Sequence, residues 1–452
     1  MARIFAKSPV PEIDEVGAAQ PNWQRKSPFD VRSSDISSPG EGNTSLKGPG
    51  TKQGKRFPTV LWSEGSPNHI PSSWTNENTM VDWDTITIRS PVDKEFVPPS
   101  GDKRDFTSFV VYAWPCSKLP ANCLNYGRKR YRKKCKAPEW RICDGHFNEE
   151  GMRISGAVDF RIFCRELEAA SAEFKLRQTP SAGAAAVRYV RSWFVNSSTA
   201  LLPRLLYSQT VPFSSDRSRK VGSDDSVIDW WLMPNLLDSI TAIQDLLTEE
   251  DKTVIHSWFR DFLKFISRDK VRRLHNRHPA NHGPWYDVVY YSLCAWLGDH
   301  DAMRAQAPWT KEKLDRMVEA DGNMPHETSR RSSVYYYIYT LDSFAVCAAL
   351  LSRVGEDLWS YSSAKGATMR TMFELVAPHA KENFANWPWA TSADYRAHQL
   401  ERPLLLAAAY DLRPKNMSSA ELVELAKAVR KPRTHTYLIR PDLYFAGEAV
   451  AL

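Results

Sequence analysis

An Asn-His pair directly precedes a Gly-Pro dipeptide and an apolar helix. Asn281 and His282 are followed by Gly283 and Pro284. The apolar positions of the helix behind them recur at helical spacing, at Val289, Leu293 and Trp296. We therefore expect both polar side chains at a helix N-terminus, where backbone N–H groups and the helix dipole favour an anion. An amide beside an imidazole can bind a carboxylate and titrate near neutral pH, although a histidine at a helix start is more often a capping residue.

A second polar segment, residues 325–337, combines a proline, a glutamate, two arginines and three tyrosines. Pro325 and Glu327 suit a helix start, and Arg330 follows one turn later. Arg330 and Tyr337 are seven positions apart, two turns along one helical face, and Tyr336 is displaced from that face by one position. Spacing alone also fits an amphipathic helix with half-buried tyrosines.

Helices must position both segments, and apolar stripes at three- to four-residue spacing predict them. Thr248 before three acidic residues predicts an N-cap with a favourable first turn. Helix follows helix without convincing alternating strands, so we expect an all-α fold of antiparallel helix pairs. The stripes are Phe160, Phe163, Leu167 and Phe174; Leu236, Ile240, Ile243 and Leu247; Ile255, Phe259, Phe262 and Ile266; and Leu341, Phe344, Ala348 and Leu351.

The chain divides into three parts by composition. Residues 1–55 are rich in Ser, Pro, Gly and charge, which predicts disorder. Residues 56–148 are aromatic, Pro-rich and irregular, which predicts long loops that pack on something larger. Residues 149–452 carry the helical pattern and form the expected main domain.

The charge and the aromatic content narrow the partners without choosing one. The formal net charge is +7, which favours polyanions such as nucleic acid, anionic lipid or acidic glycan. Much of the excess lies in the basic run 128–136, which is most often a solvated loop but is also typical of a nucleic-acid patch. The 16 Trp, 17 Tyr and 19 Phe suit either sugar stacking or large aromatic cores.

The sequence gives weaker indications about metal binding, membrane association and localisation. Four of the seven cysteines lie between Cys116 and Cys143, without the close pairs of a zinc site, so we expect no metal. No run of about 18 apolar residues is present, and we expect no membrane span. Residues 1–14 lack the apolar run of a signal peptide, so the localisation stays open.

Together, the two polar segments resemble the signature stretches of the alginate-lyase-like polysaccharide lyase domain. The family patterns are Asn-His-Gly-x-Trp-Tyr and, about 50 residues later, a Pro-x-Glu-x-x-Arg helix with a tyrosine six residues after the arginine. The likeness covers roughly residues 95–410 and is closest to the fungal branch. Further matching stretches are residues 99–108, Tyr112-Ala113-Trp114-Pro115, Asp144-Gly145-His146-Phe147-Asn148, Trp193-Phe194, and Pro203, Leu205, Tyr207 and Gln209.

The resemblance implies an (α/α) toroid, or incomplete barrel, that cleaves an acidic, uronate-containing polysaccharide by β-elimination without a metal or other cofactor. Asn281 and Arg330 would neutralise the uronate carboxylate. Tyr336 would be the acid, and His282 the base or a carboxylate partner. The family also implies secretion and, in an oxidising compartment, a Cys116–Cys143 bridge. Predicted sugar-binding residues are Tyr112, Trp114, Tyr207, Gln209, Trp285 and Tyr286.

Several positions depart from the family pattern, and they leave a degenerate helical-toroid protein that binds acidic glycan or another polyanion as the alternative. A nucleic-acid-binding role through the basic run is a third hypothesis, which predicts binding that weakens steeply with salt. The departures are Leu202 and Ala280 in place of asparagines, Arg331 in place of threonine, Tyr335 in place of histidine, Arg104 and Phe106 in place of histidine and tyrosine, and Ala113 in place of an aromatic residue.

Overall fold

The computed structural model describes residues 56–58, 60–61, 81–121, 123, 136–214, 222, 226–391, 397–415 and 417–429. These residues belong to one compact unit, Arg56–Leu452. The predicted disordered segment 1–55 lies outside the described residues, as does the basic run apart from Lys136. The corresponding predictions of disorder and of nucleic-acid binding therefore stay predictions.

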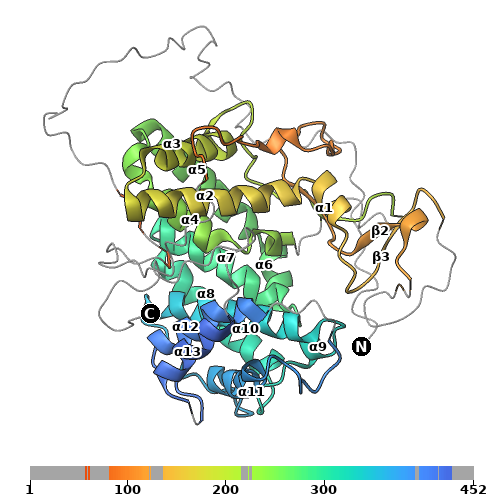
Figure 1. The fold of residues 1–452 in the computed structure, drawn as a ribbon, viewed down its shortest axis with the longest axis vertical. Helices are drawn as coiled ribbons and strands as arrows, with labels where there is room; N and C mark the ends of the chain where they lie inside the picture. Colours follow the sequence, from red (N-terminus) through yellow and green to blue (C-terminus); the bar gives the residue numbers. More distant parts are fainter. Residues whose placement is uncertain are drawn as a thin grey trace, which may run out of the picture. The chain divides into compact units, whose positions relative to one another are not determined.

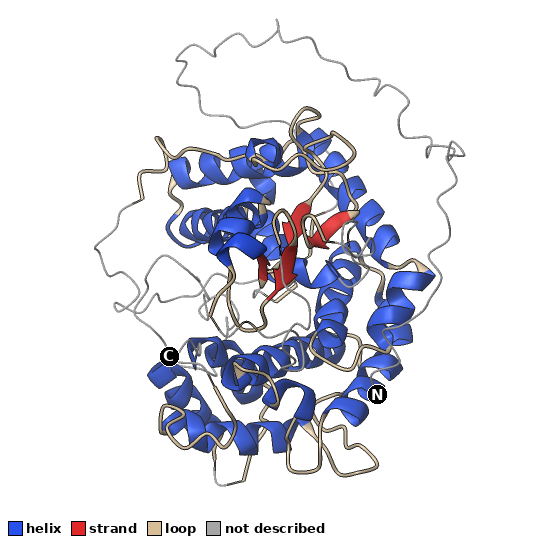
Figure 2. Cartoon of the chain, turned by 90° about the vertical axis from the view of Figure 1, so that its right-hand side faces the viewer, coloured by secondary structure: helices blue, strands red, loops and turns tan. Residues whose placement is uncertain are grey.

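Within the described residues, thirteen α-helices form the body of the unit (Figures 1 and 2). Helices α2, α3 and α5 lie toward one end, α11 and α13 toward the other, and α7 between them (Figure 1). The all-α prediction is thus confirmed. The bounds are α1 Glu149–Ile154, α2 Ala157–Arg177, α3 Pro180–Val190, α4 Met233–Ala242, α5 Glu249–Ile266, α6 Asp269–Asn276, α7 His282–Leu297, α8 His300–Met317, α9 Pro325–Thr328, α10 Ser333–Ser352, α11 Met369–Lys381, α12 Glu401–Ala409 and α13 Ser419–Val429.

The predicted apolar stripes fall on α2, α4, α5 and α10 and are largely buried. Thr248 caps α5 as expected, because its side chain accepts from the Asp251 backbone N–H in a capping box. One stripe extends past its helix, since α4 ends at Ala242 and a short 3-10 turn, Gln244–Leu246, follows. The buried Gln244 side chain in this turn accepts from the Phe57 backbone N–H at 2.7 Å. The turn therefore binds the segment at residue 57 to the helices.

Helix α10 is the most enclosed of the long helices. It packs against α7, α8, α9, α11 and α12. By length and composition it could cross a membrane, with a mean hydropathy of 1.4, but 94% of the tested window is buried inside the protein. Apolar residues all round a helix are expected at the centre of a large fold. Its Tyr337, for example, lies in the main core and donates to the carbonyls of Gly322 and Met372.

Four short strands form two small sheets, which the sequence reading missed. Strands β1 (Thr107–Phe109) and β4 (Tyr207–Thr210) pair in parallel. Strands β2 (Ala113–Pro115) and β3 (Trp140–Ile142) pair antiparallel. Each strand has only three or four residues, too few to show an alternating apolar pattern. They nevertheless fix the loop-rich segment, because β1 pairs with a strand nearly 100 residues further along the chain.

The described part of residues 56–148 packs directly on the helices. Phe57, Val60 and Trp83 belong to the main core. The Val60 backbone N–H donates to buried Asp238 on α4 at 2.5 Å, and the Trp193 indole donates to the Arg89 carbonyl at 2.8 Å. The division into a loop-rich segment and a helical domain at residues 148 and 149 stays a prediction.

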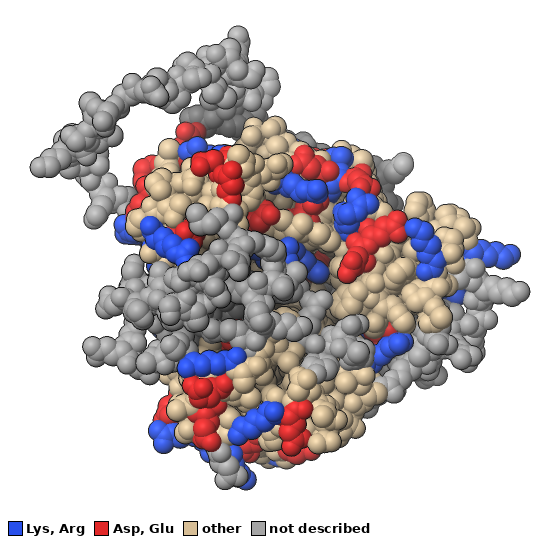
Figure 3. All heavy atoms as spheres, in the orientation of Figure 1, with Lys and Arg blue, Asp and Glu red and all other residues tan. Residues whose placement is uncertain are grey.

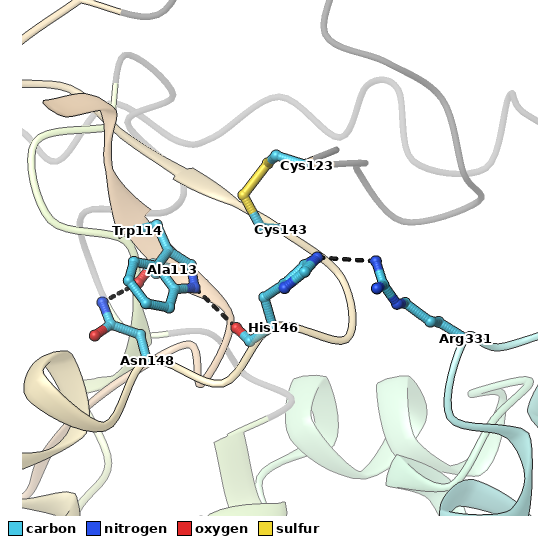
Figure 4. The surroundings of a disulfide bond; sticks show 7 residues. All are labelled: Ala113, Trp114, Cys123, Cys143, His146, Asn148 and Arg331. Atoms are coloured by element: carbon cyan, nitrogen blue, oxygen red, sulfur yellow. Dashed lines mark hydrogen bonds between the residues drawn. A yellow bond between two sulfur atoms is a disulfide. The ribbon is translucent and has the colours of Figure 1, made fainter. Parts of the chain in front are cut away.

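The predicted Cys116–Cys143 bridge is wrong. Cys143 pairs with Cys123, with a Cα–Cα distance of 5.0 Å (Figure 4). Cys116 is also disulfide-bonded. The register of β2 and β3 gives the reason. The backbone N–H of Cys143 donates to the Tyr112 carbonyl, whereas the backbone N–H of Cys116 donates to the Glu139 carbonyl. Tyr112 and Cys116 lie four positions apart at the two ends of β2, a distance of about 13 Å along extended chain, which is well beyond the span of a disulfide.

Candidate active site

Two tyrosines, an arginine and an aspartate from distant parts of the chain meet in one cluster. Tyr336 lies in the first turn of α10, and its hydroxyl hydrogen-bonds with that of Tyr112, the residue just before β2. Arg330 Nη2 donates to Tyr336 Oη at 2.9 Å and to Asp144 Oδ1 at 2.6 Å. We call Tyr112, Asp144, Arg330 and Tyr336 the tyrosine cluster. It brings together two of the predicted catalytic residues and one predicted sugar-binding residue.

A break between two helices, rather than one continuous helix, creates this contact. Helix α9 ends at Thr328 and α10 begins at Ser333, so Arg330 lies in the turn between them. The expectation that Arg330 and Tyr337 share a helical face is therefore wrong. Tyr336 and Tyr337 are both on α10 and point apart, since adjacent helical positions differ by about 100°. Tyr336 reaches the tyrosine cluster, whereas Tyr337 is buried in the main core.

Asn281 and Glu327 form a second, buried contact. Asn281 is the residue before α7, and its side chain makes no cap hydrogen bond to that helix. Instead, its backbone N–H donates to Glu327 Oε1 at 2.7 Å and its side-chain amide to Oε2 at 2.9 Å. Both residues are almost fully buried. The carboxylate thus fixes the amide plane and leaves one amide N–H of Asn281 for another acceptor.

His282 interacts electrostatically with this contact and with a third polar group. It acts on Glu327 and on Asp229, a buried residue of the 3-10 helix Ser226–Trp230. Asp229 accepts from Ser108 and from the Gln209 side chain, the latter at 2.5 Å. Arg330 also acts on Glu327. Glu327 therefore connects the two signature segments through its hydrogen bonds with Asn281. Asp229 binds the predicted residue Gln209 and interacts with His282 of the first segment.

Burial dominates the protonation of the acidic groups at the site. It raises the pKa of Tyr336 well above its usual range, and Arg330 acts in the opposite direction. Burial likewise raises the pKa of Glu327, against the hydrogen bonds from Asn281 and the charge of Arg330. The pKa of Asp229 is raised by burial, against the hydrogen bond from Ser108. Tyr336 is consequently a neutral phenol at neutral pH, the form that can donate a proton.

Two predicted sugar-binding residues lie in the core instead. Trp285 and Tyr286 on α7 have 0% exposed surface. Trp285 packs against Tyr339, and the Tyr286 hydroxyl donates to the Ile266 carbonyl at 3.2 Å. They follow His282 by three and four positions on α7, so they lie one turn further along the helix, on the face that packs in the core. A ring without exposed surface cannot stack on a sugar, so the prediction that these two residues bind sugar is wrong.

The two other aromatic residues that were predicted to bind sugar are half-buried. Trp114 on β2 is half-buried, and its indole donates to the His146 carbonyl at 2.8 Å (Figure 4). Tyr207 on β4 is half-buried beside Gln209. Leu202, where the family pattern has asparagine, is half-buried and its backbone N–H donates to the Arg104 carbonyl.

Sequence reasoning missed the three carboxylates that hold these groups. Asp144 and Glu327 stand inside the matched motifs, so their position in the motif was the available signal. Asp229 lies among apolar residues in the sequence. An acidic residue in such a segment is a signal for a buried, paired carboxylate, because unpaired carboxylates are rarely buried.

Charged side chains of both signs are interspersed on the face of the protein shown in Figure 3. Ion pairs among the charged residues at the surface include Lys118 with Glu150 and Arg104 with Asp102. On this face the described part of the chain therefore gives no reason to prefer one kind of polyanion over another.

Comparisons with known proteins give the family of the chain and relatives of its fold. Residues 91–387 match the family model described as alginate lyase. The fold is similar to that of an alginate lyase from Bacteroides ovatus, with a TM-score of 0.68, 21% sequence identity, and coverage of 80% of this chain and 90% of that one. Alginate lyase A1-III from Sphingomonas species A1 aligns with a TM-score of 0.44 and 14% identity, over 75% of this chain and 86% of that one.

A comparison with curated proteins gives no match. The family match covers well over half of the chain, from the segment before β1 into the loop after α11. It includes both signature segments and the Asp144 turn. The chain belongs to the alginate lyase family of polysaccharide lyases, which act on acidic polysaccharide by β-elimination, and it has the (α/α)-toroid fold.

Proposed function

We propose that the chain is a catalytically competent lyase for a polyuronate such as alginate or glucuronan, with Tyr336 as its proton donor. The observation that supports this most directly is the environment of the Tyr336 hydroxyl. It receives a hydrogen bond from Arg330 and shares another with Tyr112. A phenol that loses its proton there becomes a phenolate facing a guanidinium and a second hydroxyl, which stabilise the new charge.

In the proposed reaction, the uronate carboxylate binds first to the amide of Asn281 and to His282. The Glu327 carboxylate holds the Asn281 amide in one orientation, so a donor is in place before the substrate arrives. Neutralising the uronate carboxylate makes its α-proton more acidic. Arg330 is already paired with Asp144, so we assign it to Tyr336 rather than to the substrate carboxylate.

His282 then accepts the proton next to the uronate carboxylate. The electron pair of that C–H bond forms the new C=C bond, and the C–O bond to the leaving sugar breaks. The leaving oxygen takes the proton of Tyr336, whose phenolate Arg330 and Tyr112 stabilise. Proton exchange with solvent returns His282 and Tyr336 to their starting forms. No redox step is involved, and atoms and charge balance.

Glycan binding without turnover is the second candidate. Ala280 and Leu202 replace asparagines of the family pattern, and Tyr336 is only 7% exposed. A site that binds a polyuronate but releases no unsaturated product would support this alternative. Retained binding of nucleic acid after loss of His282 would instead support the third hypothesis.

The test is the ultraviolet absorbance of an unsaturated uronate released from alginate, glucuronan and related polyuronates. Wild type should produce it, and Tyr336→Phe should lower kcat by about 10²- to 10⁴-fold, because only the proton-donating hydroxyl is lost. Affinity for the polyuronate, measured by calorimetric titration, should change little.

Tyr337→Phe is the matched control on the same helix. It removes a buried hydroxyl that donates to the Gly322 and Met372 carbonyls. It should cost about 1 kcal/mol of the free energy of unfolding and leave kcat within a few-fold of wild type. Full activity in Tyr336→Phe would refute the proton-donor assignment.

A further inference from the structure

Two consecutive arginines are held by one turn, Asp144-Gly145-His146, in different ways. Arg330 Nη2 pairs with Asp144 Oδ1 at 2.6 Å. Arg331 extends past Gly145, and its Nη1 bonds with His146 Nε2 at 2.9 Å (Figure 4). The first arginine is thus neutralised by a carboxylate, and the second contacts an imidazole.

Gly145 makes room for the second arrangement. It has φ +78°, which favours glycine, and a Cβ at this position would lie 2.8 Å from Cδ of Arg331. The stem of Arg331 therefore packs on bare backbone. This close approach directs its guanidinium to His146 and holds the long side chain in one place.

The Arg331–His146 pair keeps a net positive charge. Every guanidinium nitrogen is a donor, so a hydrogen bond to Nε2 requires the neutral ring with its lone pair there. Burial and the charge of Arg331 lower the pKa of His146, which keeps the ring neutral. Among the described residues, the hydrogen-bonding partner of the Arg331 guanidinium is this neutral ring.

This charge is exposed, and the residue that carries it directly follows Arg330 of the tyrosine cluster. Arg331 is an exposed residue, while its neighbour Arg330 reaches Tyr336. A polyuronate carries one carboxylate on each sugar, so a sugar beside the reacting one brings a second anion. A guanidinium can bind that anion through two parallel hydrogen bonds.

Resting on the proposed function, we propose that Arg331, supported by His146, binds the carboxylate of a uronate next to the reacting sugar. The residue then selects for uninterrupted runs of uronate, because a neutral sugar at that place would leave the guanidinium without its anion. It acts on substrate binding and takes no part in proton transfer.

The test compares wild type with Arg331→Gln on a tetrauronate, with initial rates read from the absorbance of the unsaturated product. KM should rise about tenfold and kcat should stay within about twofold, since an interaction equal in ground and transition states changes KM alone. An unchanged KM, or a loss of kcat at unchanged KM, would overturn the proposal.

Two variants control for charge and shape. Arg331→Lys keeps the charge without the planar fork and should lie between wild type and Arg331→Gln. Arg304→Gln on α8 removes the same net charge from a residue bound to Asp301, and its KM should equal that of wild type. A rise of KM in Arg304→Gln equal to that in Arg331→Gln would show a non-specific charge effect and sink the proposal.

The proposed function and this inference fail in different ways. If wild type cleaves the tetrauronate and Arg331→Gln cleaves it equally well at low substrate, only the role of Arg331 is lost. If wild type releases no product, calorimetric titration of the tetrauronate decides. A Kd about tenfold weaker for Arg331→Gln supports the subsite, whereas equal affinities or no binding by wild type refute it.

Discussion

The protein contains two networks of the same residue types, one in its core and one at the candidate site. In the core network, Lys313 of α8 pairs with Asp287 of α7 at 2.6 Å, and both side chains are 0% exposed. Gln306 and Thr310 also donate to Asp287, and the Tyr291 hydroxyl bonds with Thr310. The tyrosine cluster likewise combines a cation, a carboxylate and tyrosine hydroxyls.

The two networks differ in what their charged groups contact and in how far they are enclosed. In the core network both Asp287 oxygens accept from side chains of α8, so the network fastens α7 to α8. In the tyrosine cluster the charge of Arg330 is directed at a hydroxyl, and the side chain of Arg330 is 20% exposed. The same groups stabilise the fold when fully enclosed and are available for chemistry at the edge of the protein.

The largest expected effect comes from breaking the core network. Asp287→Asn leaves the buried Lys313 charge without its carboxylate and should lower the free energy of unfolding by about 3–5 kcal/mol. Chemical denaturation measures this loss. The kcat of the folded fraction should be unchanged, because Asp287 does not contact the tyrosine cluster.

The double variant Asp287→Leu with Lys313→Met checks that interpretation. Replacing a buried ion pair by apolar residues of similar volume is often close to neutral. The double variant should therefore be more stable than Asp287→Asn. A double variant as unstable as the single one would show that shape, rather than the unpaired charge, is responsible.

A smaller effect, on activity rather than stability, is expected at the candidate site. Asp144→Asn loosens Arg330 from its position beside Tyr336 and should lower kcat by about 10- to 100-fold, as small displacements of catalytic groups do. Arg330 keeps 20% exposure, so the free energy of unfolding should fall by about 1–3 kcal/mol, less than in Asp287→Asn.

Asp144→Glu serves as the control, since it keeps the charge with a longer stem and should retain more activity than Asp144→Asn. Steady-state rates and thermal unfolding of the same preparations separate the two effects. A variant that keeps full activity while losing as much stability as Asp287→Asn would remove the distinction between the networks.

The smallest effect concerns His146, which faces Arg331 and Asp144. Burial and Arg331 lower its pKa in the folded state, so the unfolded chain takes up the proton first as the pH falls. The contribution of His146 to stability is present above its usual pKa and is lost as the pH falls through the lowered value. His146→Gln should therefore lose less stability than wild type on acidification below about pH 6.5.

Unfolding midpoints at a series of acidic pH values measure this difference. The core network should not contribute to this acid dependence in the same pH range, because its groups are enclosed and no histidine is among them. An acid dependence that is identical in His146→Gln and wild type would contradict the coupling between His146 and Arg331.

Local sequence patterns determined the helices and the order of the chemical motifs. Apolar stripes at helical spacing forecast α2, α5 and α10, since burying one face of a helix needs only residues a turn apart. The six-residue spacing in the family motif selected Tyr336 over Tyr337. Both residues are on α10, where adjacent positions point in different directions.

Tertiary structure decided the contacts between segments far apart in the chain. The pairing of Cys143 depends on the register of β2 and β3, which strands of three residues do not reveal in sequence. The pairing of Arg330 with Asp144 joins residues 186 positions apart. Whether an aromatic ring such as Trp285 binds sugar or fills the core depends on what covers it, and that neighbour is set by the packing of helices rather than by the residues beside it in the chain.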